Sequence, residues 1–72
     1  MKVTIIGAGV LGTSLGILLR QKGYGIASIC SRHVRSAREA REMIGAGEVT
    51  GDAGLAAMGA DIVLLAVPDR AI

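Results

Sequence analysis

The sequence predicts an α/β fold, in which parallel strands form one sheet and helices cover both of its faces. Short apolar, β-branched runs alternate with segments of helical periodicity along the 72 residues. The chain is 51% hydrophobic but has a single aromatic residue, Tyr24, so its core must be aliphatic, as is typical of buried parallel strands. The eleven glycines fall at turn positions rather than at a fixed period. A single domain of this size is marginally stable unless something supports it.

The first elements surround a glycine-rich turn. Lys2–Ile6 is a mostly apolar, β-branched run that predicts a strand, and the sequence GAGVLG follows directly as Gly7–Gly12. A helix is expected from Val10 to Lys22, ended by Gly23. Its apolar stripe, at i, i+4, i+7 and i+8, consists of Leu11, Leu15, Leu18 and Leu19. A G-x-G-x-x-G motif between a strand and a helix predicts dinucleotide binding.

Each glycine of the motif has its own expected role. Gly7 allows a tight turn, Gly9 lets a pyrophosphate approach the backbone, and Gly12 lets the helix pack against the strand. The first helical turn has amides without partners and carries the positive end of the helix dipole, so it favours an anion. Thr13 and Ser14 could contact a phosphate there, or could equally cap the helix or face solvent. The alternative to dinucleotide binding is a glycine-rich turn without a ligand.

The end of the second expected strand, Ile26–Ser31, indicates which dinucleotide is bound. NAD-binding proteins place an Asp or Glu about 20 residues beyond the glycine motif, where it binds the ribose 2′-hydroxyl. Ser31 stands nineteen residues after Gly12, and the next acid is Glu39. A hydroxyl beside the planar guanidinium of Arg32 suits a 2′-phosphate, which predicts NADP rather than NAD. The alternative is that Arg32 is only a solvated loop residue. Two residues that could extend a phosphate site are His33 and Arg35.

A second helix is expected at Val34–Ile44, followed by a short edge strand at Glu48–Thr50. The helix has one apolar face, made of Ala37, Ala40 and Ile44. Asp52 is the expected N-cap of a brief helix, Ala53–Met58. In that helix the residues expected to face the core are Leu55 and Met58.

The last expected strand is Ile62–Val67, whose uninterrupted apolar sequence predicts burial on both faces. Pro68 would end it, because proline cannot donate to the sheet. Asp69–Ile72 resembles the start of another helix. Without a further neighbour this strand would be an apolar sheet edge, so we expect self-association into a homo-oligomer.

The sequence lacks the features that are typical of several other functions. The net charge of +2 comes mainly from arginines between Arg32 and Arg41, but Glu39 interrupts them and no aromatic residue lies nearby to stack on bases, so nucleic-acid binding is not expected. No Gly-Lys-Ser or Gly-Lys-Thr occurs, which argues against a P-loop ATPase. Cys30, the only cysteine, is expected to be a buried, inert thiol. Asp52 has no companion ligands, so no metal site is expected.

We expect neither a signal peptide nor a membrane-spanning segment. Met1 and Lys2 lead straight into the first strand, without a signal peptide. The longest apolar run, Ile62–Val67, is far too short to cross a bilayer. We therefore expect a cytoplasmic protein that does not contact membranes.

Three features together, the glycine motif, Ser31-Arg32 and the Val67-Pro68-Asp69 segment, resemble the N-terminal Rossmann-type domain of the 6-phosphogluconate-dehydrogenase-like oxidoreductases. Within that group the chain is similar to pyrroline-5-carboxylate reductases, prephenate dehydrogenases and deazaflavin-dependent NADP reductases. The resemblance covers nearly the whole chain. It implies a parallel sheet of order 3-2-1-4, truncated after the fourth strand.

The resemblance also implies roles for particular residues. Those lining the pyrophosphate would be Gly7, Gly9, Val10, Leu11 and Gly12. Ser31 and Arg32 would take the 2′-phosphate of the adenosine. The residues beside the nicotinamide half would be Ala66, Val67 and Pro68. These enzymes continue into further strands and a helical domain that supplies catalysis and dimerisation, so residues 1–72 would be the cofactor domain alone, with a C-terminal domain or partner chain missing.

The expected function is an NADP(H)-binding domain of an oxidoreductase that transfers a hydride between the nicotinamide and a small substrate. The nicotinamide supplies that chemistry, and no catalytic acid or base can be named; Asp69 is a candidate by position only. A non-catalytic nucleotide-binding or sensor module is the alternative. A flavin-binding Rossmann protein is a further one, although the missing acid after the second strand argues against it.

Overall fold

A computed structural model of the chain describes residues 1–7 and 9–66, and it confirms the predicted α/β class. Four parallel strands form one sheet in the order β3-β2-β1-β4, as the resemblance implied. The strands are β1 (Lys2–Ile6), β2 (Gly25–Cys30), β3 (Glu48–Thr50) and β4 (Ile62–Leu65). The helices are α1 (Val10–Gln21), α2 (Val34–Ile44) and α3 (Ala53–Met58).

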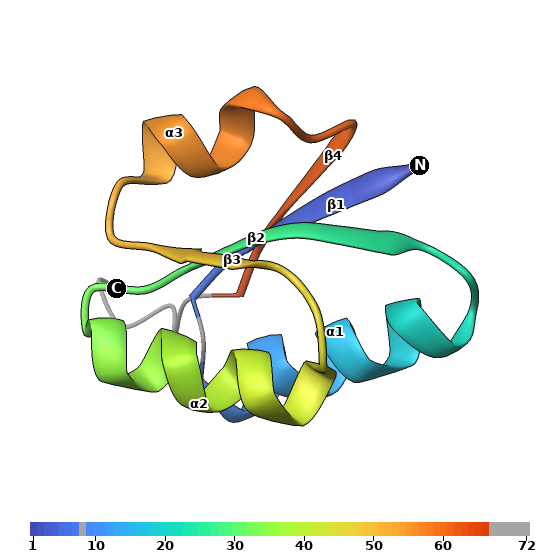
Figure 1. Ribbon diagram of the computed structural model, residues 1–72, viewed down its shortest axis with the longest axis horizontal. Helices are drawn as coiled ribbons and strands as arrows, with labels where there is room; N and C mark the ends of the chain where they lie inside the picture. Colours follow the sequence, from blue (N-terminus) through green and yellow to red (C-terminus); the bar gives the residue numbers. More distant parts are fainter. Residues whose placement is uncertain (8, 67–72) are drawn as a thin grey trace, which may run out of the picture.

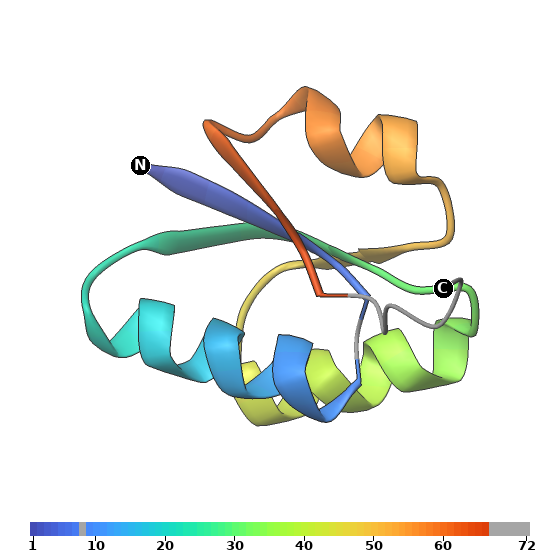
Figure 2. The ribbon, with the colours of Figure 1, turned by 180° about the vertical axis from the view of Figure 1, so that it is seen from behind.

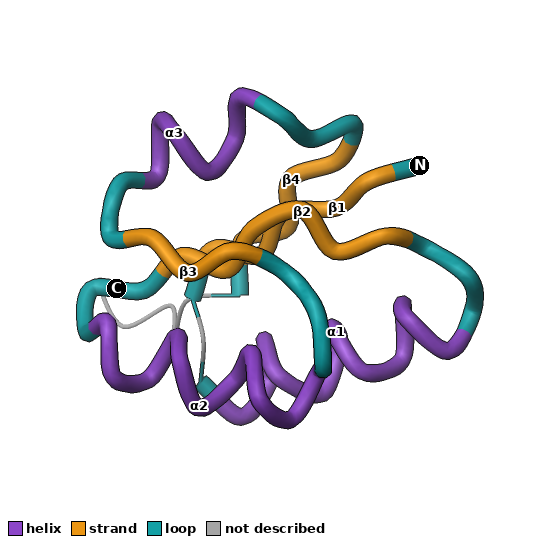
Figure 3. The backbone as a smooth tube through the Cα atoms, viewed as in Figure 1, coloured by secondary structure: helices purple, strands orange, loops and turns teal. Residues whose placement is uncertain are grey.

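The helices lie in layers on the two faces of the sheet. Figures 1 and 2 show α1 and α2 side by side on one face and α3 on the other. Figure 3 shows how loops return the chain from each helix to the next strand. The chain moves from β1 through β2 to β3 with both connecting helices on one face, then crosses back to β4 with α3 on the other, as right-handed crossovers require.

β1 lies at the centre of the core, paired with β2 on one side and β4 on the other. Its Thr4 is buried, and the Thr4 hydroxyl donates to the Ala56 carbonyl oxygen at 2.6 Å, which ties β1 to α3. The buried hydrophobic cluster of this core consists of Val3, Ile5, Ile26, Ile29, Ala37, Ala40 and Ile44. The predicted inward face of α2 is therefore confirmed.

The predicted leucine stripe of α1 is wrong in part, because the helix packs through glycines. Its buried residues are Gly12 and Gly16, whereas Leu11 is 60% exposed and Leu18 is 48% exposed. A Cβ atom on Gly16 would lie 2.9 Å from Ile5 Cδ1 and would also overlap Ile44. Leu19 packs against the core as predicted, whereas Leu11 and Leu18 are exposed.

The ends of the elements follow the predicted turn chemistry closely. α1 ends at Gln21 with Lys22 as its cap, one residue before the predicted end, and Gly23 follows with φ +94°. The amides of Gly23 and Tyr24 donate back to the last turn of α1, as in a Schellman motif. β2 begins and ends one residue earlier than predicted, so Ser31 is the first residue after the strand.

β4 is far more exposed than its sequence predicted. Val63 is 40% exposed and Leu65 is 72% exposed, because β4 lies at the sheet edge and α3 packs over β1, β2 and β3 instead. The prediction that α3 turns Leu55 and Met58 toward the core is also wrong, since these side chains are 62% and 81% exposed while Ala56 is buried. β4 ends at Leu65, so the prediction that Ala66 belongs to the strand is wrong. Val67, Pro68 and the expected helix start after them lie outside the described residues.

Candidate functional site

The carboxyl ends of the parallel strands meet at one edge of the sheet, where the β1–α1 turn is held between its neighbours. The Gly7 amide donates to the Cys30 carbonyl oxygen at 2.8 Å, and the Ala66 amide donates to the Ile6 carbonyl oxygen at 2.8 Å. A cavity of about 600 Å³ opens at this edge. Its volume suits a small-molecule or cofactor site.

Most of the residues that the sequence analysis singled out line this cavity. They are Gly7, Gly9, Val10, Leu11, Ser31, Arg32 and Ala66. Gly12 does not line it but lies buried beneath the turn, and Val67 and Pro68 lie outside the described residues. Residues that the sequence analysis identified in separate segments therefore lie around one cavity in the fold.

The start of α1 faces the cavity without a side-chain cap. Gly7 turns the chain with φ +104°, and Gly9 is the N-cap residue, with no side-chain hydrogen bond among the described residues. The first amide to bond within the helix is that of Thr13, which donates to the Gly9 carbonyl oxygen at 2.9 Å. The earlier amides, of Val10, Leu11 and Gly12, have no partner inside the helix by geometry, and they carry the positive end of its dipole.

The second and third glycines of the motif occupy different surroundings. A Cβ atom on Gly12 would overlap the Gly7 carbonyl oxygen, so glycine is required there by the protein's own packing. A Cβ atom on Gly9 would have no neighbour within 4 Å, and Gly9 has no positive φ. No described part of the protein requires a glycine at position 9. A group that approaches the backbone from the cavity would require one.

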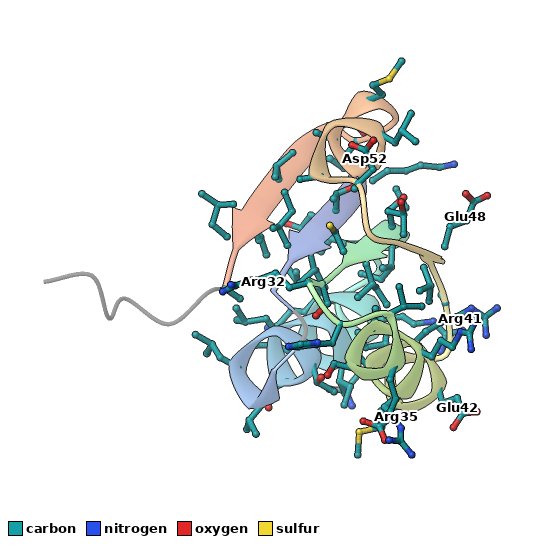
Figure 4. The ribbon with its side chains drawn as sticks, turned by 90° about the vertical axis from the view of Figure 1, so that its left-hand side faces the viewer. Arg32, Arg35, Arg41, Glu42, Glu48 and Asp52 are labelled. Carbon is teal, nitrogen blue, oxygen red and sulfur yellow. The ribbon has the colours of Figure 1, made fainter. Side chains whose placement is uncertain are left out.

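The segment after β2 supplies the positively charged side of the cavity. Figure 4 shows Arg32 toward the ends of the strands, apart from the labelled charged residues of α2. The His33 amide donates to Ser31 Oγ at 3.3 Å, which fixes the turn and leaves the Ser31 hydroxyl proton to donate elsewhere. α2 begins directly after His33, without a side-chain cap and with no acidic residue in its first turn. The cation and the helix dipole both favour an anion here.

The sequence analysis did not identify several other residues that line the cavity: Ile6, Cys30, Gly51 and Ala53. Gly51 and Ala53 flank Asp52, whose carboxylate accepts from the amides of Gly54 and Leu55 at 2.9 and 3.1 Å, so its predicted N-cap role is confirmed. Neither Gly51 nor Ala53 belongs to a motif. The sequence feature that could have identified them is their place after β3, once the sheet order is known.

The surroundings of Cys30 disfavour the thiolate form. It is buried at the end of β2, and this burial raises the pKa of the thiol, with a smaller rise from the Asp52 carboxylate. The protonated thiol therefore prevails near neutral pH, and only a thiolate is a strong nucleophile. Within residues 1–7 and 9–66, no cluster of His, Cys, Asp and Glu side chains is suited to hold a metal ion.

Residues 2–72 match the family model of the NADP oxidoreductases described as coenzyme F420-dependent. The chain belongs to this family. Coenzyme F420 is a deazaflavin, so the similarity to deazaflavin-dependent NADP reductases inferred from the sequence is confirmed at the level of the family. The fold is accordingly an NADP-oxidoreductase-type Rossmann domain.

A solved structure supports the same assignment. A protein from Bacteroides fragilis with the provisional name NADP oxidoreductase is 32% identical and superposes with a TM-score of 0.83 over 94% of this chain. The chain spans only 26% of that protein. No curated protein matches the sequence. No helix within the described residues of this family member has the length and apolar character needed to cross a membrane.

Proposed function

We propose that the chain is the NADP(H)-binding domain of an oxidoreductase that transfers a hydride between the nicotinamide and a small substrate. The observation that carries this proposal is the shared cavity: the uncapped start of α1 and the Ser31-Arg32 segment both line it. The start of α1 favours a diphosphate, and the Ser31-Arg32 segment favours a further phosphate. A dinucleotide with a 2′-phosphate has both groups in one molecule.

The residues present fit such a cofactor. Gly9 is the main support, because it lines the cavity and a Cβ atom on it would meet no described protein atom within 4 Å. The residues proposed to hold the diphosphate are Gly7, Gly9, Val10, Leu11 and Gly12. Ser31 and Arg32 would hold the 2′-phosphate, by a hydroxyl donor and a planar guanidinium.

The nicotinamide half is proposed to lie near Ala66, Val67 and Pro68, the three residues that follow β4 in the sequence. Bound nicotinamide supplies the hydride chemistry, and the chain's own residues bind and orient the cofactor. The family description and the provisional name of the Bacteroides fragilis protein both support NADP and a redox reaction.

Substrate binding and catalysis are proposed to come from a further domain or a partner chain. This chain corresponds to 26% of the Bacteroides fragilis protein, so most of that protein has no counterpart in these 72 residues. In this proposal, residues 1–72 form a single dinucleotide-binding domain whose reaction depends on what it is joined to.

The first prediction concerns Arg32. Replacement Arg32→Asp removes a cation from the proposed 2′-phosphate site and adds a like charge, so we expect NADPH affinity to fall by about 10- to 100-fold, the worth of one charge-assisted hydrogen bond. NADH affinity should be unchanged or higher. Both constants are measured by fluorescence or calorimetric titration.

Arg38→Asp is the matched control, because it makes the same charge change on α2 at an exposed position that does not line the cavity. It should leave both affinities within about twofold, as expected for a distant, screened charge. Equal NADPH affinity in the wild type and in Arg32→Asp would remove Arg32 from the site. Absence of binding of either dinucleotide to the wild type would contradict the proposed function itself.

A further inference from the structure

We infer that His33 makes the preference for the phosphorylated dinucleotide depend on pH, an inference that rests on the proposed function. His33 lines the same cavity as Arg32, its neighbour in the chain. An imidazole changes its charge close to neutral pH, whereas the Arg32 guanidinium keeps its charge throughout. The two residues would therefore contribute to specificity in different ways.

The backbone fixes His33 at this place. It is the N-cap residue of α2, with φ −111° and ψ 112°, and its amide is bonded to Ser31 Oγ at 3.3 Å. Its imidazole makes no capping bond to α2, and the residue is exposed. His33 is therefore held at the edge of the cavity, at the positive end of an eleven-residue helix, and its ring nitrogens are not engaged in capping.

Most of the charges around His33 are positive. Arg32 precedes it, and Arg35 follows in the first turn of α2. From β2 comes the buried thiol of Cys30, which is neutral near pH 7. The β3–α3 connection brings Asp52, whose carboxylate already accepts from the α3 amides of Gly54 and Leu55. The β1–α1 turn lines the cavity with uncharged residues only, among those described: Ile6, Gly7, Gly9, Val10 and Leu11.

In these surroundings a bound phosphate changes the charge balance. A phosphate monoester carries close to two negative charges above about pH 7, and a nearby negative charge favours the protonated form of an imidazole. Binding of the phosphorylated dinucleotide should therefore be accompanied by proton uptake at His33. A dinucleotide with a bare 2′-hydroxyl lacks this coupling. By linkage, the NADP/NAD affinity ratio must fall as the pH rises through the range where uptake occurs.

The test uses the oxidised dinucleotides NADP⁺ and NAD⁺, which tolerate mild acid better than the reduced forms. It covers pH 7.0 to 8.5, where the 2′-phosphate of NADP⁺ is almost fully ionised and releases few protons of its own on binding. Isothermal titration calorimetry in two buffers of different ionisation enthalpy gives the number of protons taken up on binding. We expect the wild type to take up a fraction of a proton with NADP⁺ and none with NAD⁺. The affinity ratio should change by about three- to tenfold over this range, since one fully coupled proton gives at most tenfold per pH unit.

His33→Gln keeps a hydrogen-bonding side chain without the titration, so it should abolish the uptake with NADP⁺ and flatten the affinity ratio. His33→Asn is a second variant with the same expected result, and asparagine is a favourable N-cap that protects the fold. Arg38→Gln, which alters a charge of α2 outside the cavity, should keep the wild-type pH profile. Undiminished uptake in both His33 variants would overturn the inference. Failure of the wild type to bind NADP⁺ at any pH would instead contradict the proposed function.

Discussion

Gly9 and Gly12 belong to one motif, but the protein itself packs against only one of them. At Gly12 a side chain would overlap the Gly7 carbonyl oxygen, so this glycine is needed whether or not a ligand binds. At Gly9 a side chain would meet no atom of the described protein. The two positions therefore separate the structural role of the motif from its proposed binding role.

The residue-scale prediction follows from this difference. Gly9→Ala should cost no more than about 1 kcal/mol of folding stability, because alanine is a poorer N-cap than glycine but meets no clash. It should weaken NADPH binding at least about tenfold, since a methyl group would separate the diphosphate from the amides and weaken a charge-assisted contact. Thermal unfolding and dinucleotide titration measure the two effects.

Gly59→Ala is the matched control. Gly59 caps the C-terminal end of α3, has no neighbour within 4 Å of an added Cβ, and lies away from the cavity. It should change neither NADPH affinity nor stability by much. If Gly9→Ala bound NADPH as tightly as Gly59→Ala, close approach at Gly9 would not be part of binding.

At the scale of elements, β4 is one of the two edge strands of the sheet, and most of its side chains are exposed. Among the described residues it pairs with β1 alone, and its Val63 and Leu65 side chains are 40% and 72% exposed. A sheet edge made of aliphatic residues is a template for pairing with another chain. The self-association expected from the sequence therefore remains a prediction, now with β4 as its proposed contact.

We expect the isolated chain to self-associate at micromolar concentrations, as measured by light scattering or sedimentation. Leu65→Lys should shift it toward the monomer with little loss of stability, because Leu65 is 72% exposed and an edge lysine opposes strand pairing. Leu18→Lys, at an exposed position of α1, is the control and should leave the association unchanged. A wild-type chain that stays monomeric across the micromolar range would count against this role of β4.

The elements themselves could be predicted from sequence, but the depth at which they are buried could not. The bounds of α2, β3 and α3 were predicted as observed, because glycine and Asp52 mark their ends by local turn and cap chemistry. Exposure depends instead on which element covers which. The prediction of a leucine stripe on α1 was wrong in part, because Gly12 and Gly16 are its buried residues. The prediction that β4 is buried was wrong, because α3 packs over the other three strands.

At the scale of the whole molecule, the sheet order creates the site. Parallel strands place the β1–α1 turn, the segment after β2 and the β3–α3 connection at one edge, although they are far apart in the sequence. Residues with a chemical signature, such as Gly9 and Arg32, could be identified before the fold was known. Gly51 and Ala53 could not, because only the topology brings them to the cavity.

The central claim is that the uncapped amides at the start of α1 receive the diphosphate of NADP(H). The most direct test is to titrate NADP⁺ into ¹⁵N-labelled protein and follow each backbone amide by NMR. We predict that the amides of Val10, Leu11 and Gly12 show the largest shifts and saturate together with those of Ser31 and Arg32. Saturable binding that leaves the first turn of α1 unshifted would contradict the claim.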